Sequence, residues 1–167
     1  MKMHKMNRAL LLAVVLATGA VVGCGNDQGD GNTVTSVRHN PDGTTSVNTV
    51  WMSSAELAQM DSQRTALAAA GKEGAAPSLD TGCAGASMWI YDNFWQTGNR
   101  ICFAGPGDDF LANYAAPGGG NWSTANKSYW SGAYGGSFTY TTGSLWVFST
   151  YEQGNGPGAG YNKLHQQ

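Results

Sequence analysis

SFTYTTGSLWVFS, residues 137–149, is the stretch that most strongly decides the fold. In its first half Phe138 and Tyr140 alternate with hydroxyl residues, so a strand over residues 137–141 has one apolar face. Thr142-Gly143-Ser144 has the composition of a turn, and a second β-prone run follows at residues 145–149. The stretch therefore predicts an antiparallel hairpin.

The surrounding sequence, residues 83–151, has the same character. It contains sixteen aromatic residues interrupted throughout by glycine, and no long stretch has helical periodicity. Short β-prone runs bounded by Gly, Pro and Asn are typical of a small all-β domain. We predict such a domain over residues 81–156, with further strands at 87–91, 100–103 and 128–130, followed by a flexible tail at 157–167.

Two cysteines, Cys83 and Cys102, lie in this region. An even pair in an exported chain indicates a disulfide. It would close a loop of about 19 residues and contribute roughly 3 kcal/mol in the chain-entropy model. The alternative is a pair of free, buried thiols.

The preceding segment, residues 33–80, predicts a hairpin, one helix and a linker. Asn40-Pro41-Asp42-Gly43 has turn chemistry, because Pro presets φ, Asp bonds back to the backbone and Gly accepts positive φ. Ser53 and Glu56 fit a capping box before a helix over residues 53–70. Its apolar stripe is narrow, so we expect the helix to dock weakly or act as a spacer, with a domain boundary in the linker at 72–80.

The first 23 residues have the layout of a secretory signal peptide: basic residues, an apolar run and small residues before Cys24. The apolar run is shorter than the roughly 20 residues that span a bilayer. The segment ending at Cys24 resembles the lipobox of bacterial lipoproteins, which implies that the Cys24 sulfur carries lipid and that cleavage makes it the N-terminus. The alternative is an ordinary cleaved signal with an incidental cysteine.

The lipobox resemblance predicts a membrane lipoprotein of the cell envelope that faces the periplasm or exterior. Residues 24–32 would be a polar tether. Gly25 carries no obvious inner-membrane retention charge, which favours the outer membrane where a cell has one.

The charge of the mature chain limits its partners. Without the first 23 residues it has six basic and eleven acidic residues, a net charge of −5. Nucleic-acid affinity depends on basic contacts to phosphate, so this balance argues against a nucleic-acid partner. We expect membrane contact through the lipid rather than through charge.

Two segments resemble the βγ-crystallin family. In WIYDNFWQTG, residues 89–98, Tyr91, Phe94 and Gly98 match the aromatic strand end, second aromatic and required glycine of that family's folded hairpin. ICFAGPG, residues 101–107, resembles the next strand and turn. The resemblance implies a Greek-key β sandwich, here held by a disulfide and preceded by the hairpin and helix. Another small β sandwich or barrel is the alternative.

The family also suggests functions. Many bacterial members bind calcium, but this chain lacks their motif, and only Asp92, Asn93, Asp108 and Asp109 supply candidate oxygen ligands. We therefore predict no required cofactor, with calcium as the alternative. Other small members of the fold resemble metalloproteinase inhibitors, which makes a protease a candidate partner by analogy alone.

The residues themselves favour binding over catalysis. No nucleophile motif, phosphate loop or selected carboxylate pair is present, and His39 and His165 lie in segments that look peripheral. Trp95, Trp122, Trp130 or Tyr134, where exposed, could stack on sugar rings of an envelope polysaccharide, although most aromatics are expected to form the core. Three hypotheses follow: a binding or structural module, a peptidase inhibitor, and a carbohydrate-binding module.

Overall fold

The computed structural model describes residues 30–70, 83, 87–156 and 160–167. Ten strands, two helices and two short 3₁₀ turns occur in this part of the chain. They are β1 Gly31–His39, β2 Thr45–Ser53, α1 Ser54–Ala70, β3 Met88–Tyr91, η1 Phe94–Gln96, β4 Arg100–Ala104, β5 Gly107–Phe110, η2 Leu111–Asn113, α2 Trp122–Ala125, β6 Ser128–Trp130, β7 Gly136–Tyr140, β8 Leu145–Phe148, β9 Gln153–Asn155 and β10 Tyr161–Gln166.

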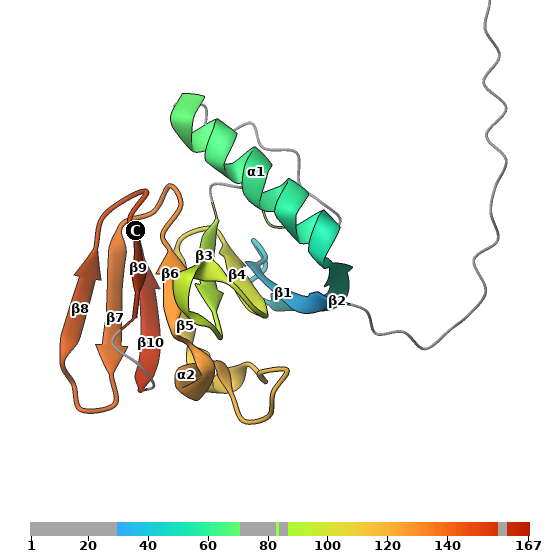
Figure 1. Cartoon of the computed structure of the whole chain (residues 1–167). Coiled ribbons are helices and arrows are strands. Elements are labelled where there is room, and N and C mark those ends of the chain that lie inside the picture. The colour runs from blue at the N-terminus through green and yellow to red at the C-terminus, as the bar shows by residue number, and fades with distance from the viewer. Residues whose placement is uncertain (1–29, 71–82, 84–86, 157–159) are drawn as a thin grey trace, which may run out of the picture.

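The strands form two sheets, so the prediction of a mainly β fold is confirmed (Figure 1). The first sheet has six strands in the order β2-β1-β4-β3-β6-β9, and the second has four in the order β5-β10-β7-β8. Most neighbours are antiparallel, and β1 and β4 run parallel. The predicted hairpin at residues 137–149 is present as β7 and β8.

Two groups of four consecutive strands, β3–β6 and β7–β10, follow the same path. In each group the fourth strand returns beside the first, which gives the orders β4-β3-β6 and β8-β7-β10. The third strand of each group joins the opposite sheet: β5 pairs with β10, and β9 pairs with β6. The two groups are therefore interlocked.

The C-terminal segment differs from the predicted flexible tail at 157–167. Within it, β10 is a central strand that pairs with β5 on one side and with β7 on the other. Its Tyr161 and Leu164 are buried in the core. The sequence of β10 is polar in four of six positions, so its apolar period was too weak to predict a strand without its neighbours.

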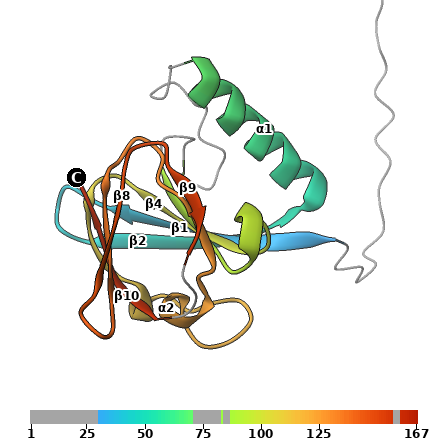
Figure 2. The same cartoon turned by 60° about the vertical axis from the view of Figure 1, so that its left-hand side comes forward.

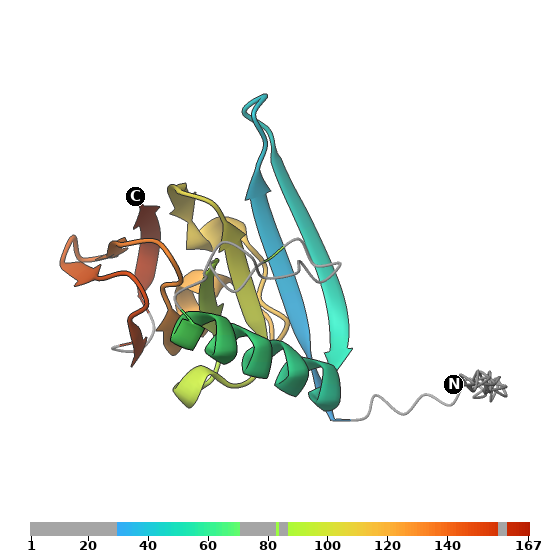
Figure 3. The same ribbon diagram turned by 90° about the horizontal axis from the view of Figure 1, so that it is seen from above.

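The hairpin of β1 and β2 turns at Pro41-Asp42-Gly43 as predicted. Gly43 has φ +83°, and the Thr44 backbone N–H donates to Asp42 Oδ1 at 2.9 Å. Figure 3 shows the hairpin extending past the rest of the molecule. Because β1 pairs with β4 along five residues, the hairpin belongs to the six-stranded sheet. This corrects the predicted boundary between segments 33–80 and 81–156, whose linker at 72–80 lies outside the described residues.

The main core lies between the two sheets. It consists of side chains from seven of the ten described strands, from η2 and α2, and from the connection between η2 and α2: Val37, Met88, Ile90, Ile101, Phe103, Leu111, Ala116, Trp122, Tyr129, Phe138, Phe148, Tyr161 and Leu164. Phe138 contacts Tyr129, Phe148 and Tyr161 at ring-centroid distances of 4.6 to 5.5 Å. Aromatic burial of this kind supplies a large apolar area in a short chain.

A second core covers the other face of the six-stranded sheet. Alternate residues of β3, Trp89 and Tyr91, point to this face, where Leu57 and Met60 pack. The helix that carries Leu57 and Met60, α1, lies alongside the six-stranded sheet (Figure 2). The predicted capping box is present, since Ser53 N–H donates to Glu56 Oε2 at 2.8 Å. The helix is thus a layer of the fold rather than the weakly docked spacer that the narrow stripe suggested.

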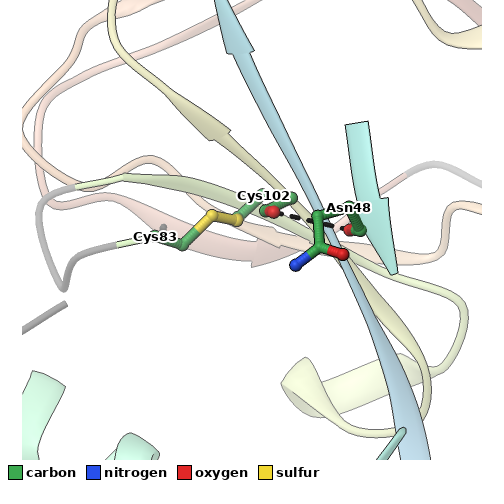
Figure 4. The surroundings of a disulfide bond; sticks show 4 residues. Asn48, Cys83 and Cys102 are labelled. Atoms are coloured by element: carbon green, nitrogen blue, oxygen red, sulfur yellow. Dashed lines mark hydrogen bonds between the residues drawn. A yellow bond between two sulfur atoms is a disulfide. The ribbon is translucent and has the colours of Figure 1, made fainter. Parts of the chain in front are cut away.

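The predicted disulfide joins Cys83 to Cys102 within this second core (Figure 4). The two Cα atoms are 6.3 Å apart, which is within the normal range for a disulfide. Cys102 lies in β4, beside β1, whose Ser36 Oγ donates to the Asn48 carbonyl of β2. The bond therefore anchors the chain before β3 to the middle of the sheet.

Candidate functional site

The four aromatics proposed to stack on ligands have different environments. Trp122 is fully buried and Trp130 is 9 % exposed, so both belong to the cores and lack the exposure on which their stacking role depended. Tyr134 is half-buried. Trp95 is 77 % exposed, the largest exposed fraction among the large hydrophobic residues of the described chain.

Trp95 also has an unusual backbone. Its φ of 60° and ψ of 34° place it in the left-handed region, and Gln96 follows with φ 56°. A bulky L-residue there costs about 1–2 kcal/mol. Two consecutive residues in this conformation persist only where surrounding contacts determine them, which is a feature of ligand-binding segments.

We call residues 94–97 the Trp95 loop. Its backbone N–H groups donate hydrogen bonds to side chains of β6 and β9. Trp95 N–H donates to Asn155 Oδ1 at 2.9 Å, and Gln96 N–H donates to Ser128 Oγ at 3.0 Å. Ser128 Oγ in turn donates to the Asn93 carbonyl at 2.6 Å. The indole is therefore presented to solvent on an anchored backbone.

The remainder of the loop supports this presentation. Phe94 is 47 % exposed, and Lys127 Nζ lies 5.9 Å from the centroid of its ring, within cation–π range. Gly98 has φ +83°, and a Cβ there would lie 2.3 Å from Asp92 Oδ1. Both the positive φ and this close approach favour glycine at position 98.

Trp51 is an exposed aromatic that the sequence reasoning did not select. It is 50 % exposed and packs so closely on Gly31 that a Cβ on Gly31 would lie 2.3 Å from the indole. Its ring lines a cleft of about 380 Å³ with Asn32, Thr33, Asn99, Pro117 and Gly118. The sequence showed Trp51 only as a single Trp in a β-prone run. Such a Trp is as typical of the core as of an exposed surface, so the sequence offered no reason to select it.

A second cleft, of about 220 Å³, lies where α1 meets the Trp95 loop. Its walls include Asn32, Asp61, Thr97 and Arg100. Arg100 is 3 % exposed and donates from Nη1 to Asp61 Oδ1 at 2.8 Å. Arg100 has five N–H groups, and this is its one side-chain hydrogen bond in the described part of the chain.

Behind this cleft, Arg64 of α1 holds Tyr91. Its Nη1 donates to the Tyr91 hydroxyl, and its guanidinium lies 5.1 Å from the Trp130 ring. Burial raises the pKa of the Tyr91 phenol, an effect that the nearby Arg64 and Arg100 charges oppose. The phenol is thus a fixed, neutral part of the helix–sheet contact.

The candidate calcium ligands lie in two separate places. Asp92 and Asn93 are in the β3–β4 connection of the first sheet, whereas Asp108 and Asp109 are in β5 of the second. Asp92 Oδ2 accepts a hydrogen bond from Asn99 Nδ2 at 2.7 Å. In the described ranges, no group of three or more His, Cys, Asp and Glu side chains is arranged to hold a metal ion.

The two β5 carboxylates point to opposite faces of their strand. Asp108 is on the outer face, where Lys163 Nζ lies 2.8 Å from Oδ2 and His165 Nδ1 lies 2.6 Å from Oδ1. Hydrogen bonds from Lys163 and then from His165 lower the pKa of Asp108. His165 is therefore on a regular strand, which corrects its predicted placement in a frayed tail.

Asp109 is buried and joins the second sheet to the long hairpin. Its Oδ2 lies 3.0 Å from His39 Nε2, and its Oδ1 accepts from the Tyr114 hydroxyl at 2.5 Å. His39 is consequently a contact between β1 and β5 rather than a peripheral residue. Burial and the hydrogen bond to Asp109 raise the pKa of Tyr114.

The predicted lipidation site, Cys24, and the signal segment 1–23 lie outside the described residues. No helix of the described chain is both long and apolar enough to cross a bilayer.

The sequence and structure were also compared with known proteins. The chain matches no protein-family model, and comparisons with curated proteins and with solved structures found no significant match.

Proposed function

We propose that this protein is an exported, lipid-anchored and non-catalytic binding module of the cell envelope, and that the Trp95 loop is its main contact with a ligand. The observation that carries the proposal is the exposure of Trp95 on a backbone that hydrogen bonds hold in the left-handed region. An exposed, pre-ordered Trp is the residue type that most often dominates binding energy.

The sequence before the described residues supplies the location. Cys24 follows a lipobox-like segment, and a short polar sequence separates it from Gly31, the first residue of β1. The tether predicted at 24–32 is thus shorter by Gly31 and Asn32, which pair with β2. A diacyl anchor at Cys24 would hold the β domain at a membrane surface. The Trp95 loop would then face whatever surrounds that membrane.

We also propose that β3–β6 and β7–β10 are two βγ-crystallin-like Greek keys. The return of the fourth strand beside the first in each group supports this, since that path defines a Greek key. Gly98 at positive φ in the β3–β4 connection supports it as well. In this arrangement the β1–β2 hairpin and α1 are additions to the first sheet.

The environments of the histidines favour binding over catalysis. His165 Nδ1 and His39 Nε2 each contact an aspartate, and Lys163 shares Asp108 with His165. Neither histidine lines either of the clefts beside Trp51 and Arg100.

The anchor is tested by Cys24→Ala in cells that express the full chain. We expect the wild-type protein in the membrane fraction and the variant in the soluble fraction, because the thioether-linked lipid is lost. Continued fractionation of the variant with membranes would show that Cys24 is incidental.

The Trp95 loop is tested in the same Cys24→Ala background, because a lipid at Cys24 would by itself bind the protein to envelopes. The full chain is sedimented with envelopes from the expressing cells, with and without Trp95→Ala. We expect Trp95→Ala to weaken binding by about 30-fold, the size of a hot-spot loss. Leu145→Ala is the control, since Leu145 is 62 % exposed on β8. Equal binding by both variants would exclude the Trp95 loop.

A further inference from the structure

One of the edge strands of the two sheets is much longer than the others. The edge strands β9, β5 and β8 have three or four residues each, and a short edge strand gives another chain little to pair with. The fourth edge strand, β2, has nine residues and pairs with β1 along its whole length without a bulge. It runs along the outer side of the six-stranded sheet (Figure 3). In the described part of the chain, no strand pairs with its other side.

The sequence of β2 lacks the residues that usually protect an exposed edge. Charged side chains, proline and bulges are the common means of protection, but the sequence of β2 is TSVNTVWMS. No charged residue occurs from 43 to 55, whereas the mature chain has six basic and eleven acidic residues. Two copies of a chain with this net charge repel each other, so an uncharged strand is a place where a second copy can approach.

The turn of the hairpin determines which residues of β2 have free backbone groups. Asn40 N–H donates to the Thr44 carbonyl at 2.8 Å, so these two residues form a hydrogen-bonded pair. Hydrogen-bonded and non-hydrogen-bonded pairs alternate along an antiparallel ladder. The odd-numbered residues of β2 therefore direct their N–H and C=O groups away from β1: Thr45, Val47, Thr49, Trp51 and Ser53. Thr33, which is opposite Trp51, shows the same alternation, since its N–H donates to Asn99 and not to β2.

The same odd-numbered positions hold the exposed apolar side chains of β2. Val47 is 54 % exposed and Trp51 is 50 % exposed, and their spacing of four residues places them on one face of the strand. The Trp51 indole lies against Gly31, where a Cβ would come within 2.3 Å of the ring, so the ring is held on this face. Free backbone groups and exposed apolar side chains thus occur together along this edge.

An antiparallel pair of two β2 strands matches both features at once. With a two-fold axis at Thr49, Val47 of each copy lies opposite Trp51 of the other. These pairs are hydrogen-bonded, because they join residues whose backbone groups point outward. A register shifted by one residue would bring those groups opposite residues that already bond to β1, and a shift by two would separate Val47 from Trp51.

We propose that this protein forms a dimer in which two copies join edge to edge through β2, in the antiparallel register centred on Thr49. The dimer makes one continuous sheet from the two six-stranded sheets. A single pair of strands is small beside a standard interface of about 1,600 Å², so we expect a dissociation constant on the order of micromolar in solution. The inference goes beyond the proposed binding function and does not depend on the Trp95 loop.

The register predicts the result of a charge exchange at Thr49, because this residue meets itself across the axis. Sedimentation velocity from about 1 to 300 µM is measured on the full Cys24→Ala chain, on its Thr49→Lys and Thr49→Glu variants, and on an equimolar mixture of the two variants. We expect each variant alone to dimerise at least about 10-fold more weakly than the parent chain, because like charges face each other. The mixture should dimerise more tightly than either variant alone, because lysine then faces glutamate.

The two Thr49 variants are controls for each other. Both remove the hydrogen bond between the Thr49 and Thr35 hydroxyls, which are 3.1 Å apart, so this loss is common to them and to the mixture. Thermal melts confirm that each variant is folded.

Val47→Asp keeps the proposal testable if the Thr49 variants fail to fold. A carboxylate that must lose water beside the Trp51 indole of the other copy should weaken dimerisation by at least about 10-fold. Val147→Asp is the matched control, since Val147 is 69 % exposed on β8, an edge strand of the other sheet, and it should leave the dimer unchanged.

Other results would overturn the proposal in different ways. A parent chain that stays monomeric at about 300 µM would overturn the dimer. Dimers weakened by Val147→Asp but not by Val47→Asp would place the interface at β8. Dimers lost in both Thr49 variants and not recovered in the mixture would overturn the register. Loss of envelope binding in Val47→Asp, with a monomeric parent chain, would show that β2 pairs with another protein and overturn a second copy as its partner.

Discussion

Trp95 and Gly98 show that positive φ has two different origins within one short connection. At Gly98 the chain turns where a Cβ would collide with Asp92, so the residue type follows from sterics. At Trp95 the side chain points into solvent and the strain is maintained by hydrogen bonds to Asn155 and, through Gln96, to Ser128. The first position is structural, and the second exposes a binding residue at a cost in stability.

This difference predicts the stability of two variants at the same residue. Trp95→Gly should be more stable than Trp95→Ala by about 1 kcal/mol, because glycine enters the left-handed region without the strain of a Cβ. Urea unfolding of the full Cys24→Ala chain measures the difference. Equal stability of the two variants would mean that position 95 is not strained in solution.

Tyr129 predicts a pH effect at the same scale. Burial, and then its hydrogen bond to Glu152, raise the pKa of this phenol from 10 to about 12. A raised pKa favours the neutral form in the folded state, so this stabilisation is complete below pH 10 and is lost as the pH rises toward 12.

The measurement is the melting temperature between pH 9 and about 12, the range that the raised pKa defines. We expect it to fall less steeply in Tyr129→Phe than in the wild type. Some slope should remain, because burial also raises the pKa values of Tyr91, Tyr114 and Tyr140. Identical slopes in the two proteins would contradict the assigned role of Tyr129.

At the scale of elements, α1 makes the first sheet a middle layer. Alternate residues of β3 enter different cores: Met88 and Ile90 face the second sheet, whereas Trp89 and Tyr91 face α1. A strand that is buried on both faces has a continuous apolar sequence, as the four residues of β3 do. The covering helix is therefore consistent with the sequence of β3, even though the stripe of α1 is narrow.

Leu57→Ala tests whether α1 belongs to the cooperative unit. Leu57 is 3 % exposed, and its truncation should lower the free energy of unfolding by about 2–4 kcal/mol within a single transition. Gln59→Ala, on the exposed side of the same helix, is the matched control and should change little. A separate, early loss of helical signal with an unchanged main transition would indicate that α1 only rests on the sheet.

At the scale of the whole molecule, contacts between distant segments form the two clefts beside Trp51 and Arg100. The walls of the first come from β1, β2 and the connection after η2, and those of the second from β1, β4, α1 and the Trp95 loop. The parallel pairing of β1 with β4 brings Asn32 and Thr33 to Asn99, whose Oδ1 accepts from Thr33 N–H at 2.8 Å. Without this pairing, neither Trp51 nor Asp61 would lie near β4.

Local chemistry in the sequence was sufficient for many features. The hairpin at residues 137–149, the strands near 87–91, 100–103 and 128–130, the turn at Asp42-Gly43, the Ser53–Glu56 capping box and the disulfide were all predictable. Each depends on residues a few positions apart, or on the oxidation of an even cysteine pair. Alternation, turn chemistry and capping act over that range.

The tertiary structure alone decided which aromatics are exposed, how β1 joins the sheet, and that β10 is central. Trp95, Trp122 and Trp130 have similar surroundings in the sequence, yet one is in solvent and two are in the cores. The physical reason is that a side chain's exposure depends on whether a distant segment covers its face, as α1 covers Trp130 and the second sheet covers Trp122. Local sequence therefore predicted most of the strands and turns but not β5, β9 or β10. Long-range packing determined those strands and the surface with which we propose that the protein binds.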